Sequence, residues 1–102
     1  MKHLRAYDLA VQFFREVKTT QIPSPIKDQL VRASSSIVLN LAEASGRFTA
    51  KDQRKFFHYA FGSIRETQAV MEIYSECFTD KQRQLIDHIA ASTYKLIKAA
   101  GV

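Results

Sequence analysis

VRASSSIVLNLAEASGR, residues 31–47, decides the fold, because its apolar residues recur with the spacing of a helix that packs on one side. Residues seven apart fall on two neighbouring lines of that helix: Leu30, Ile37 and Ala44 on one, and Ile26, Ala33 and Asn40 on the other. The two lines are apolar except at Asn40. A carboxamide in a packed interior costs about 1–3 kcal/mol unless it is hydrogen-bonded, so the pattern predicts a polar partner for Asn40 elsewhere in the chain.

The predicted partner is a second polar break, Gly62–Glu66, which reads GSIRE. We expect four side chains to form a polar motif that fixes the register of two helices: Asn40, Glu43, Ser63 and Glu66. In this interpretation a glutamate of the second helix accepts a hydrogen bond from Asn40, while small residues such as Ser36 and Gly62 let the helices approach closely. The alternative places either glutamate in a pocket as an acid or base. No histidine or lysine accompanies them, so the pattern favours the structural role.

Length and composition limit the class of protein. A chain of 102 residues, 46% of them hydrophobic, is expected to form one domain over residues 1–102 with a folded core. Three glycines and two prolines leave little material for sheets or long loops. The single Cys77 excludes an internal disulfide, no apolar run approaches the ~18 residues that span a membrane, and the N-terminal residues lack a signal-peptide pattern. These features predict a soluble, cytoplasmic protein without a membrane partner.

Start and stop signals divide the chain into four helical stretches. The expected ranges are about 6–18, 25–44, 50–76 and 80–99. Ser24 is the expected N-cap of the second helix, with Pro25 at its first position and Gly46 at its end. Two capping boxes are expected at the last two helices: Thr49 with Asp52, and Thr79 with Gln82. Four helices joined by short loops predict an all-α fold, an antiparallel up-down-up-down four-helix bundle.

Apolar residues on the first and last helices set their expected packing. Those of the first helix recur at helical spacing: Tyr7, Val11, Phe14 and Val17. Those of the last helix cover more than the stripe of about 100° that a surface helix needs: Leu85, Ile86, Ile89, Ala90, Thr93, Leu96, Ile97 and Ala100. One face can serve the bundle and the other a second subunit, which predicts a homo-oligomer. The alternative is a central, well-buried helix.

Residues that carry catalysis or bind metals do not form a set in this sequence. His3, His58 and His88 have no partner at ligand spacing, and no glutamate has a histidine three residues further on, as a di-iron bundle site requires. No base is placed to activate the serines, and there is no glycine-rich phosphate loop. The sequence therefore predicts a protein that is not an enzyme and uses no metal or cofactor.

The charge of the chain favours an anionic partner. Fifteen Lys and Arg against ten Asp and Glu give a formal charge of +5 and a pI near 9.6. Four cations cluster after the turn between the second and third helices: Arg47, Lys51, Arg54 and Lys55. Phe48 adds a ring for stacking, and Asp52 is the one acid among them. We expect these cations to bind RNA or DNA electrostatically; the alternative is an ordinary solvated helix start. Lys95 and Lys98, in a last helical turn, are interpreted as structural.

Two segments also resemble a known family. Residues 32–44, RASSSIVLNLAEA, resemble an RxAxSIxxNIAEG signature, and residues 56–66, FFHYAFGSIRE, resemble an FxxxALGSxxE segment. Both belong to the small four-helix-bundle proteins of 23S ribosomal RNA intervening sequences, which are related to the accessory variability protein of diversity-generating retroelements. Ala44 replaces the signature glycine, so the helix is expected to extend toward Gly46.

The resemblance implies a basic, ring-shaped homopentamer that binds nucleic acid, with a reverse transcriptase or another protein as a partner in the retroelement branch. Together with the charge, it predicts a non-enzymatic accessory of a nucleic-acid-processing system. The alternative function is a protein-binding scaffold that uses wide apolar helix faces, with the charge serving only solubility.

Overall fold

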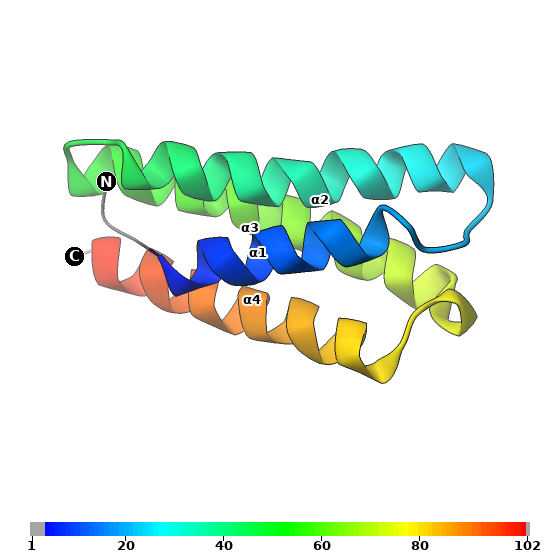
Figure 1. Ribbon diagram of the computed structural model, residues 1–102. Helices are drawn as coiled ribbons and strands as arrows, with labels where there is room; N and C mark the ends of the chain where they lie inside the picture. Colours follow the sequence, from blue (N-terminus) through cyan, green and yellow to red (C-terminus); the bar gives the residue numbers. More distant parts are fainter. Residues whose placement is uncertain (1–3, 102) are drawn as a thin grey trace.

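Four antiparallel helices make up almost all of residues 4–101, the part of the chain that this computed structural model describes (Figure 1). They are α1 (Arg5–Val17), α2 (Ser24–Ser45), α3 (Ala50–Ile73) and α4 (Asp80–Ala100), with one 3-10 turn, η1 (Ser75–Cys77), before α4. The chain runs up, down, up and down, so the α2–α3 turn lies at the same end as the start of α1 and the end of α4. The predicted four-helix bundle is confirmed.

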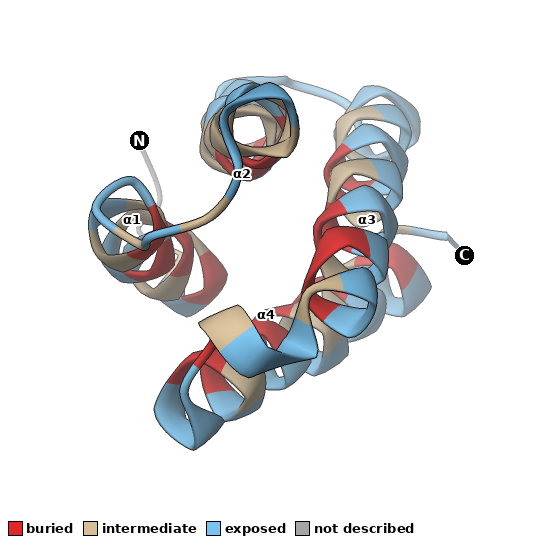
Figure 2. Cartoon of the chain, turned by 90° about the vertical axis from the view of Figure 1, so that its right-hand side faces the viewer, coloured by how far each residue is buried: buried red, intermediate tan, exposed pale blue. Residues whose placement is uncertain are grey.

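The helices are arranged so that each has two neighbours. α1 packs against α2 and α4, and α3 packs against the same two helices from the other side. Figure 2 looks along the bundle and shows the buried residues of the four helices facing one another. The largest fully buried side chains come from all four: Phe13, Val17, Leu30, Ile37, Leu41, Ile64, Thr67 and Ile89 among them.

The helix ends follow local chemistry. Thr79 and Gln82 form the complete capping box predicted for α4, with Gln82 N–H donating to Thr79 Oγ1 (3.1 Å) and Thr79 N–H donating to Gln82 Oε1 (2.9 Å). At α3 the hydroxyl of Thr49 accepts from Asp52 N–H (3.1 Å). Within the described residues Asp52 does not return this bond, because its side chain is one methylene shorter than glutamate. Gly46 ends α2 as predicted.

Two predicted boundaries are wrong. Ser24 does not cap α2; the N-cap is Pro23, and Ser24 is already helical, because the extended backbone of Pro23 (φ −53°, ψ 141°) starts the helix one residue earlier. α3 ends at Ile73 rather than near residue 76. Tyr74 leaves the helix at φ −113° and ψ 45°, and the next residues tighten into η1.

The predicted packing of α1 is also wrong in its phase. Of the four predicted residues Val17 is buried, but Tyr7, Val11 and Phe14 are only half-buried. Ala6, Ala10 and Phe13 are buried in their place. Adjacent residues point about 100° apart on a helix, so Phe13 and Phe14 cannot both face the core. Since α1 packs against both α2 and α4, Phe13 takes the central position and Phe14 turns toward the outer edge of α2.

The broad apolar surface of α4 lies inside the bundle. Leu85, Ile86, Ile89, Thr93 and Ile97 are buried, and Ala90, Leu96 and Ala100 pack at the edge of the core. The breadth reflects contacts with two helices of the same chain, α1 and α3. Burial within this chain, as in the alternative interpretation, therefore explains the breadth of α4, which carries no information about a second subunit.

Candidate nucleic-acid interface

Positive charge is concentrated at one end of the bundle. We call residues 4–11, 35–62 and 90–101 the basic half; it contains the α2–α3 turn, the start of α1 and the end of α4. It carries seven cations against three carboxylates: Arg5, Arg47, Lys51, Arg54, Lys55, Lys95 and Lys98 against Asp8, Glu43 and Asp52. The neutral half, residues 12–34 and 63–89, carries seven of each sign. The whole positive excess of the described residues, four charges, is thus in the basic half.

The four predicted cations fan out around the start of α3. Arg47 lies toward α2, where its guanidinium pairs with Glu43 (2.9 Å) and stands 4.5 Å from the centre of the Phe56 ring. Arg54 lies on the other side, because its guanidinium occupies the space beside Gly101 at the end of α4. Lys51 and Lys55 are exposed between them. Their charges are available to solvent, while that of Arg47 is partly offset by Glu43.

Antiparallel packing adds cations that sequence reasoning set aside. The last turn of α4 lies beside the first turns of α3, so Lys95 and Lys98 belong to the same half as the four predicted residues. Lys98 Nζ stands 5.8 Å from the centre of the exposed Tyr94 ring. No local signal in the sequence joins residues about forty positions apart. The interpretation of these lysines as structural rested only on their place in the last turn of their own helix, without the contact between α4 and α3.

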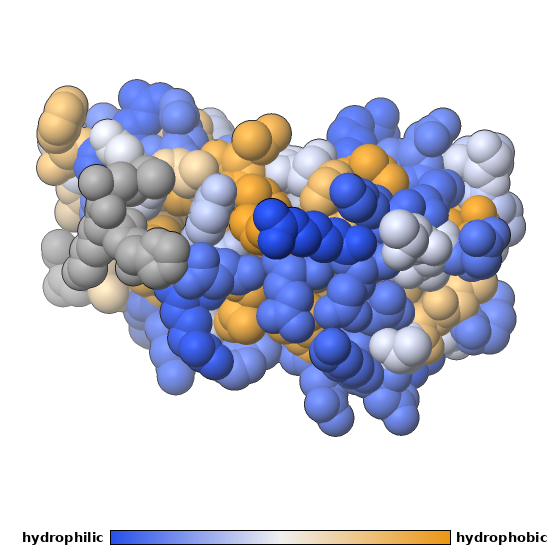
Figure 3. Space-filling model, in the orientation of Figure 1, coloured by the Kyte–Doolittle hydropathy of each residue, from blue (hydrophilic) through white to orange (hydrophobic). Residues whose placement is uncertain are grey.

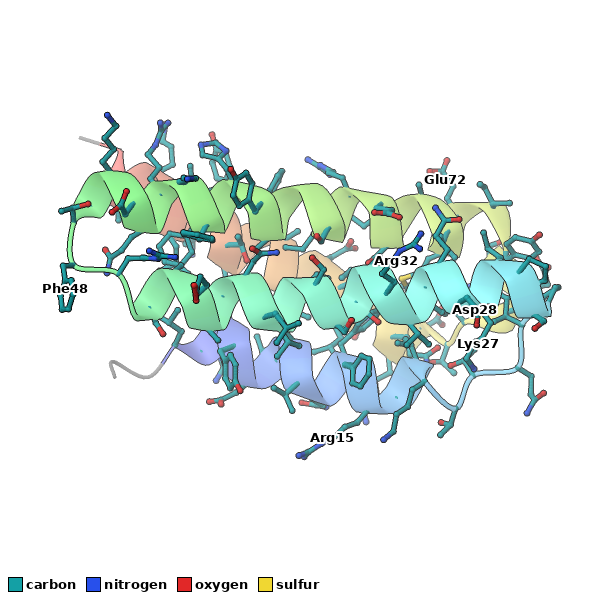
Figure 4. All side chains as sticks on the ribbon, turned by 90° about the horizontal axis from the view of Figure 1, so that it is seen from above. Arg15, Lys27, Asp28, Arg32, Phe48 and Glu72 are labelled. Atoms are coloured by element: carbon teal, nitrogen blue, oxygen red, sulfur yellow. The ribbon has the colours of Figure 1, made fainter. Side chains whose placement is uncertain are left out.

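Exposed aromatic rings accompany the cations. Phe48 projects from the tip of the α2–α3 turn, away from the helices (Figure 4), and is fully exposed. Tyr59 lies one turn after Lys55, with Lys55 Nζ 6.0 Å from its ring centre, and packs edge-on against Phe56 (5.5 Å). Tyr94 lies 6.4 Å from Phe61 across the α3–α4 contact. Phe48 was identified from the sequence; the two tyrosines were not.

The polar motif is built differently from its prediction. Asn40 does not bond to Glu66; its Nδ2 donates to Ser36 O (2.9 Å) and Ser36 Oγ (3.0 Å), on its own helix. The link to α3 is the Ser63 hydroxyl, which donates to the same Ser36 Oγ (2.9 Å). One serine oxygen therefore connects the carboxamide of α2 with the hydroxyl of α3, and Ser36 is the residue that the prediction undervalued.

The two glutamates of the motif lie apart from it. Glu43 pairs with Arg47, and Glu66 accepts from Gln29 Nε2 (3.2 Å) on α2. Both are exposed, so the geometry does not bring them together in a pocket. Gly62 is also not at a helix contact: a Cβ built on it meets no atom within 4 Å, because it faces outward from α3.

A hydrophobic groove opens between α1 and α2. Its cavity measures about 280 Å³ and is lined by Val11, Phe14, Val38 and Leu39, with Arg15 and Lys18 at one edge. Figure 3 shows this hydrophobic surface open to solvent where the two helices meet. Leu39 is 67% exposed, and the other strongly exposed aliphatic side chain is Ile73 at the end of α3 (70%).

Among residues 4–101, no group of three or more His, Cys, Asp or Glu is close enough together to hold a metal ion. None of the helices in that range combines the length and the apolar character needed to cross a bilayer.

A family model described as "23S rRNA-intervening sequence protein" matches residues 2–98 of the chain. No curated protein matches it.

Proposed function

The chain belongs to the 23S rRNA-intervening sequence protein family, and on that premise we propose that it is a non-enzymatic homo-oligomer that binds RNA or DNA through its basic half. The observation that carries the proposal is the charge distribution, with seven cations against three carboxylates at one end. Cations on a phosphate backbone release condensed counterions, which gives affinity without a shaped pocket or sequence preference. Such binding suits an accessory of a nucleic-acid-processing system.

Lys51, Arg54 and Lys55 are the main phosphate ligands in this proposal. They are exposed, and no carboxylate of the described residues pairs with them. Arg47 contributes less because Glu43, 2.9 Å away, competes with a phosphate for its guanidinium. Seven cations neutralise at most seven phosphates per chain, so on a single strand the slope of log K against log salt is at most about 5 in magnitude per chain.

The test is fluorescence anisotropy with labelled RNA and DNA, titrated from low to physiological salt. The variant K51Q/R54Q/K55Q is compared with R32Q/R65Q/K81Q, which loses the same charge from exposed positions of the neutral half outside the α1–α2 groove. We expect the first variant to lower the slope by about 2 and the control to leave it nearly unchanged. Equal losses in both variants would contradict the site assignment. No binding at low salt would favour the protein scaffold.

Self-association is the second part of the proposal, and the bundle offers two complementary surfaces. On the α1–α2 side, the apolar groove is flanked by Arg15 and Lys18. On the opposite side of the bundle, the exposed Ile73 is flanked by Glu72, with Glu76 following in η1. An apolar side chain among carboxylates complements an apolar groove edged by cations.

We infer that Ile73 of one copy enters the α1–α2 groove of the next. The two surfaces differ, so the contact is heterologous. A heterologous contact whose rotation closes generates a ring, and the pentamer implied by the family resemblance is a ring of this kind. Rotation about the ring axis keeps equivalent ends at the same height, so all basic halves form one rim.

A mixing experiment tests this contact. L39D and I73D each remove one of the two surfaces, so each variant alone is expected to be monomeric by light scattering. An equimolar mixture retains one intact pair of surfaces and forms a 1:1 dimer that cannot close. Q84D, which adds the same charge at an exposed position of α4, is the control and keeps the assembly. A mixture that stays monomeric contradicts the heterologous contact.

A further inference from the structure

The most exposed large apolar side chains are of two types, aliphatic and aromatic. There are five among the described residues: Leu39, Phe48, Tyr59, Ile73 and Tyr94. The three aromatic ones, Phe48 (103% exposed), Tyr59 (51%) and Tyr94 (52%), all lie in the basic half. The exposed area of these rings adds nothing to the core of this chain, so their shared location beside the cations points to a ligand with both flat apolar faces and negative charge.

We propose that this ligand is single-stranded nucleic acid, whose unpaired bases stack on Phe48, Tyr59 and Tyr94; the inference rests on the proposed function and names its substrate class. Base–aromatic stacking does not depend on sequence, because every base has a π face. In a duplex those faces are already stacked on neighbouring bases and are closed to protein rings. A site that used charge alone would not distinguish the two forms in this way.

Each tyrosine has a lysine ammonium close to its ring. Lys55 Nζ stands 6.0 Å from the centre of Tyr59, and Lys98 Nζ stands 5.8 Å from the centre of Tyr94. Each ammonium stands over one face of its ring, so a base stacked on the other face would have a cation within reach of its phosphate. A neighbouring phenylalanine also contacts each tyrosine. The ring centres of Phe56 and Tyr59 are 5.5 Å apart in an edge-on contact, and those of Phe61 and Tyr94 are 6.4 Å apart.

Gly62 provides an open crossing between the two tyrosines. At 100° per residue, it falls between Tyr59 and Phe61 on the surface of α3, and Phe61 leads to Tyr94. A Cβ on Gly62 would meet no atom within 4 Å, so nothing in the described chain fills this space or requires glycine there. Glycine weakens the interior of a helix, and here it exposes the α3 backbone along the path from Tyr59 to Tyr94.

The test compares single strands with duplexes of the same sequence. A labelled 20-nucleotide RNA, the same DNA, and their duplexes are titrated at one low salt concentration with wild-type protein, Y59L/Y94L and Y59F/Y94F. Leucine keeps an apolar side chain but removes the stacking face, and phenylalanine keeps the ring. We expect Y59L/Y94L to lose at least about tenfold affinity for single strands and little for duplexes, while Y59F/Y94F stays near wild type. The RNA and DNA arms show whether the sugar matters.

A 2-aminopurine base in the single strand gives an independent readout. Stacking quenches its fluorescence, so binding to wild type is expected to quench it more than binding to Y59L/Y94L. Circular dichroism checks that each variant is folded. We expect folding to be retained because both positions are exposed.

The outcomes separate this inference from the proposed function. Equal affinity of wild type for single strands and duplexes, with Y59L/Y94L unchanged, overturns the stacking site and leaves electrostatic binding in place. Absence of binding to every probe overturns both.

Discussion

Replacing Ser36 by alanine removes one oxygen that serves two donors on two helices. Ser36 Oγ accepts from Asn40 Nδ2 (3.0 Å) on α2 and from Ser63 Oγ (2.9 Å) on α3. Asn40 keeps its bond to Ser36 O (2.9 Å), but the Ser63 hydroxyl loses the partner that the described chain gives it. The substitution therefore breaks the polar link between α2 and α3 while leaving the apolar core untouched.

The expected cost follows from the number of bonds and their burial. A neutral hydrogen bond contributes about 0.5–1.5 kcal/mol net, and these groups are half-buried, so water replaces part of what is lost. We expect S36A to lower the free energy of unfolding by about 1–2 kcal/mol and S63A by about 1 kcal/mol. The double variant should cost little more than S36A alone, which gives a coupling of about 1 kcal/mol.

Urea unfolding followed by circular dichroism, at one protein concentration, measures the four free energies. S35A is the control, because the Ser35 hydroxyl bonds only within α2, to Arg32 O (3.0 Å), and its loss should change stability by less than about 0.5 kcal/mol. Additive losses from S36A and S63A, within about 0.3 kcal/mol, would refute the reasoning and show that apolar packing alone sets the register.

Five further substitutions test local packing and helix capping, and calorimetry or urea unfolding measures each. F13A should cost about 3–5 kcal/mol, because Phe13 is fully buried, and F14A clearly less, because Phe14 is half-buried; similar losses would contradict the phase of α1. T79A should cost about 1 kcal/mol through its capping box, whereas S24A, without a cap bond, should change stability by less than about 0.5 kcal/mol. G62A should stabilise the monomer by about 0.5–1 kcal/mol, and a loss would show that something occupies the open space.

The parts of the fold that depend on near neighbours in the chain were predictable from the sequence. Thr79 and Gln82 form their capping box within four residues, and Gly46 ends α2 where the apolar pattern stops. The phase of α1 was not predictable, because Phe13 and Phe14 each complete an apolar line. Only the positions of α2 and α4 decide between them.

The candidate site divides in the same way. The cluster of Lys51, Arg54 and Lys55 is continuous in sequence and was found there. Its extension to Tyr94 and Lys98 depends on the antiparallel contact of α3 and α4, which no local pattern encodes. The sequence showed that Asn40 needs a hydrogen-bond partner, and the prediction chose a glutamate of α3. The partner is Ser36, one turn earlier on the same helix, whose oxygen is within reach of the carboxamide.

The separation of charge along the bundle reconciles the two parts of the proposed function. Seven cations per chain on one rim repel their copies, and this repulsion opposes assembly. The neutral half compensates, because its cations predominate on the α1–α2 side and its carboxylates on the α3–α4 side, so a head-to-tail contact joins opposite charges. Salt screens both the repulsion between the basic halves and their attraction to phosphate, so added salt favours assembly and weakens nucleic-acid binding. A bound nucleic acid neutralises the basic halves and should therefore stabilise the assembly. The assembly in turn offers the same nucleic acid several basic halves to bind.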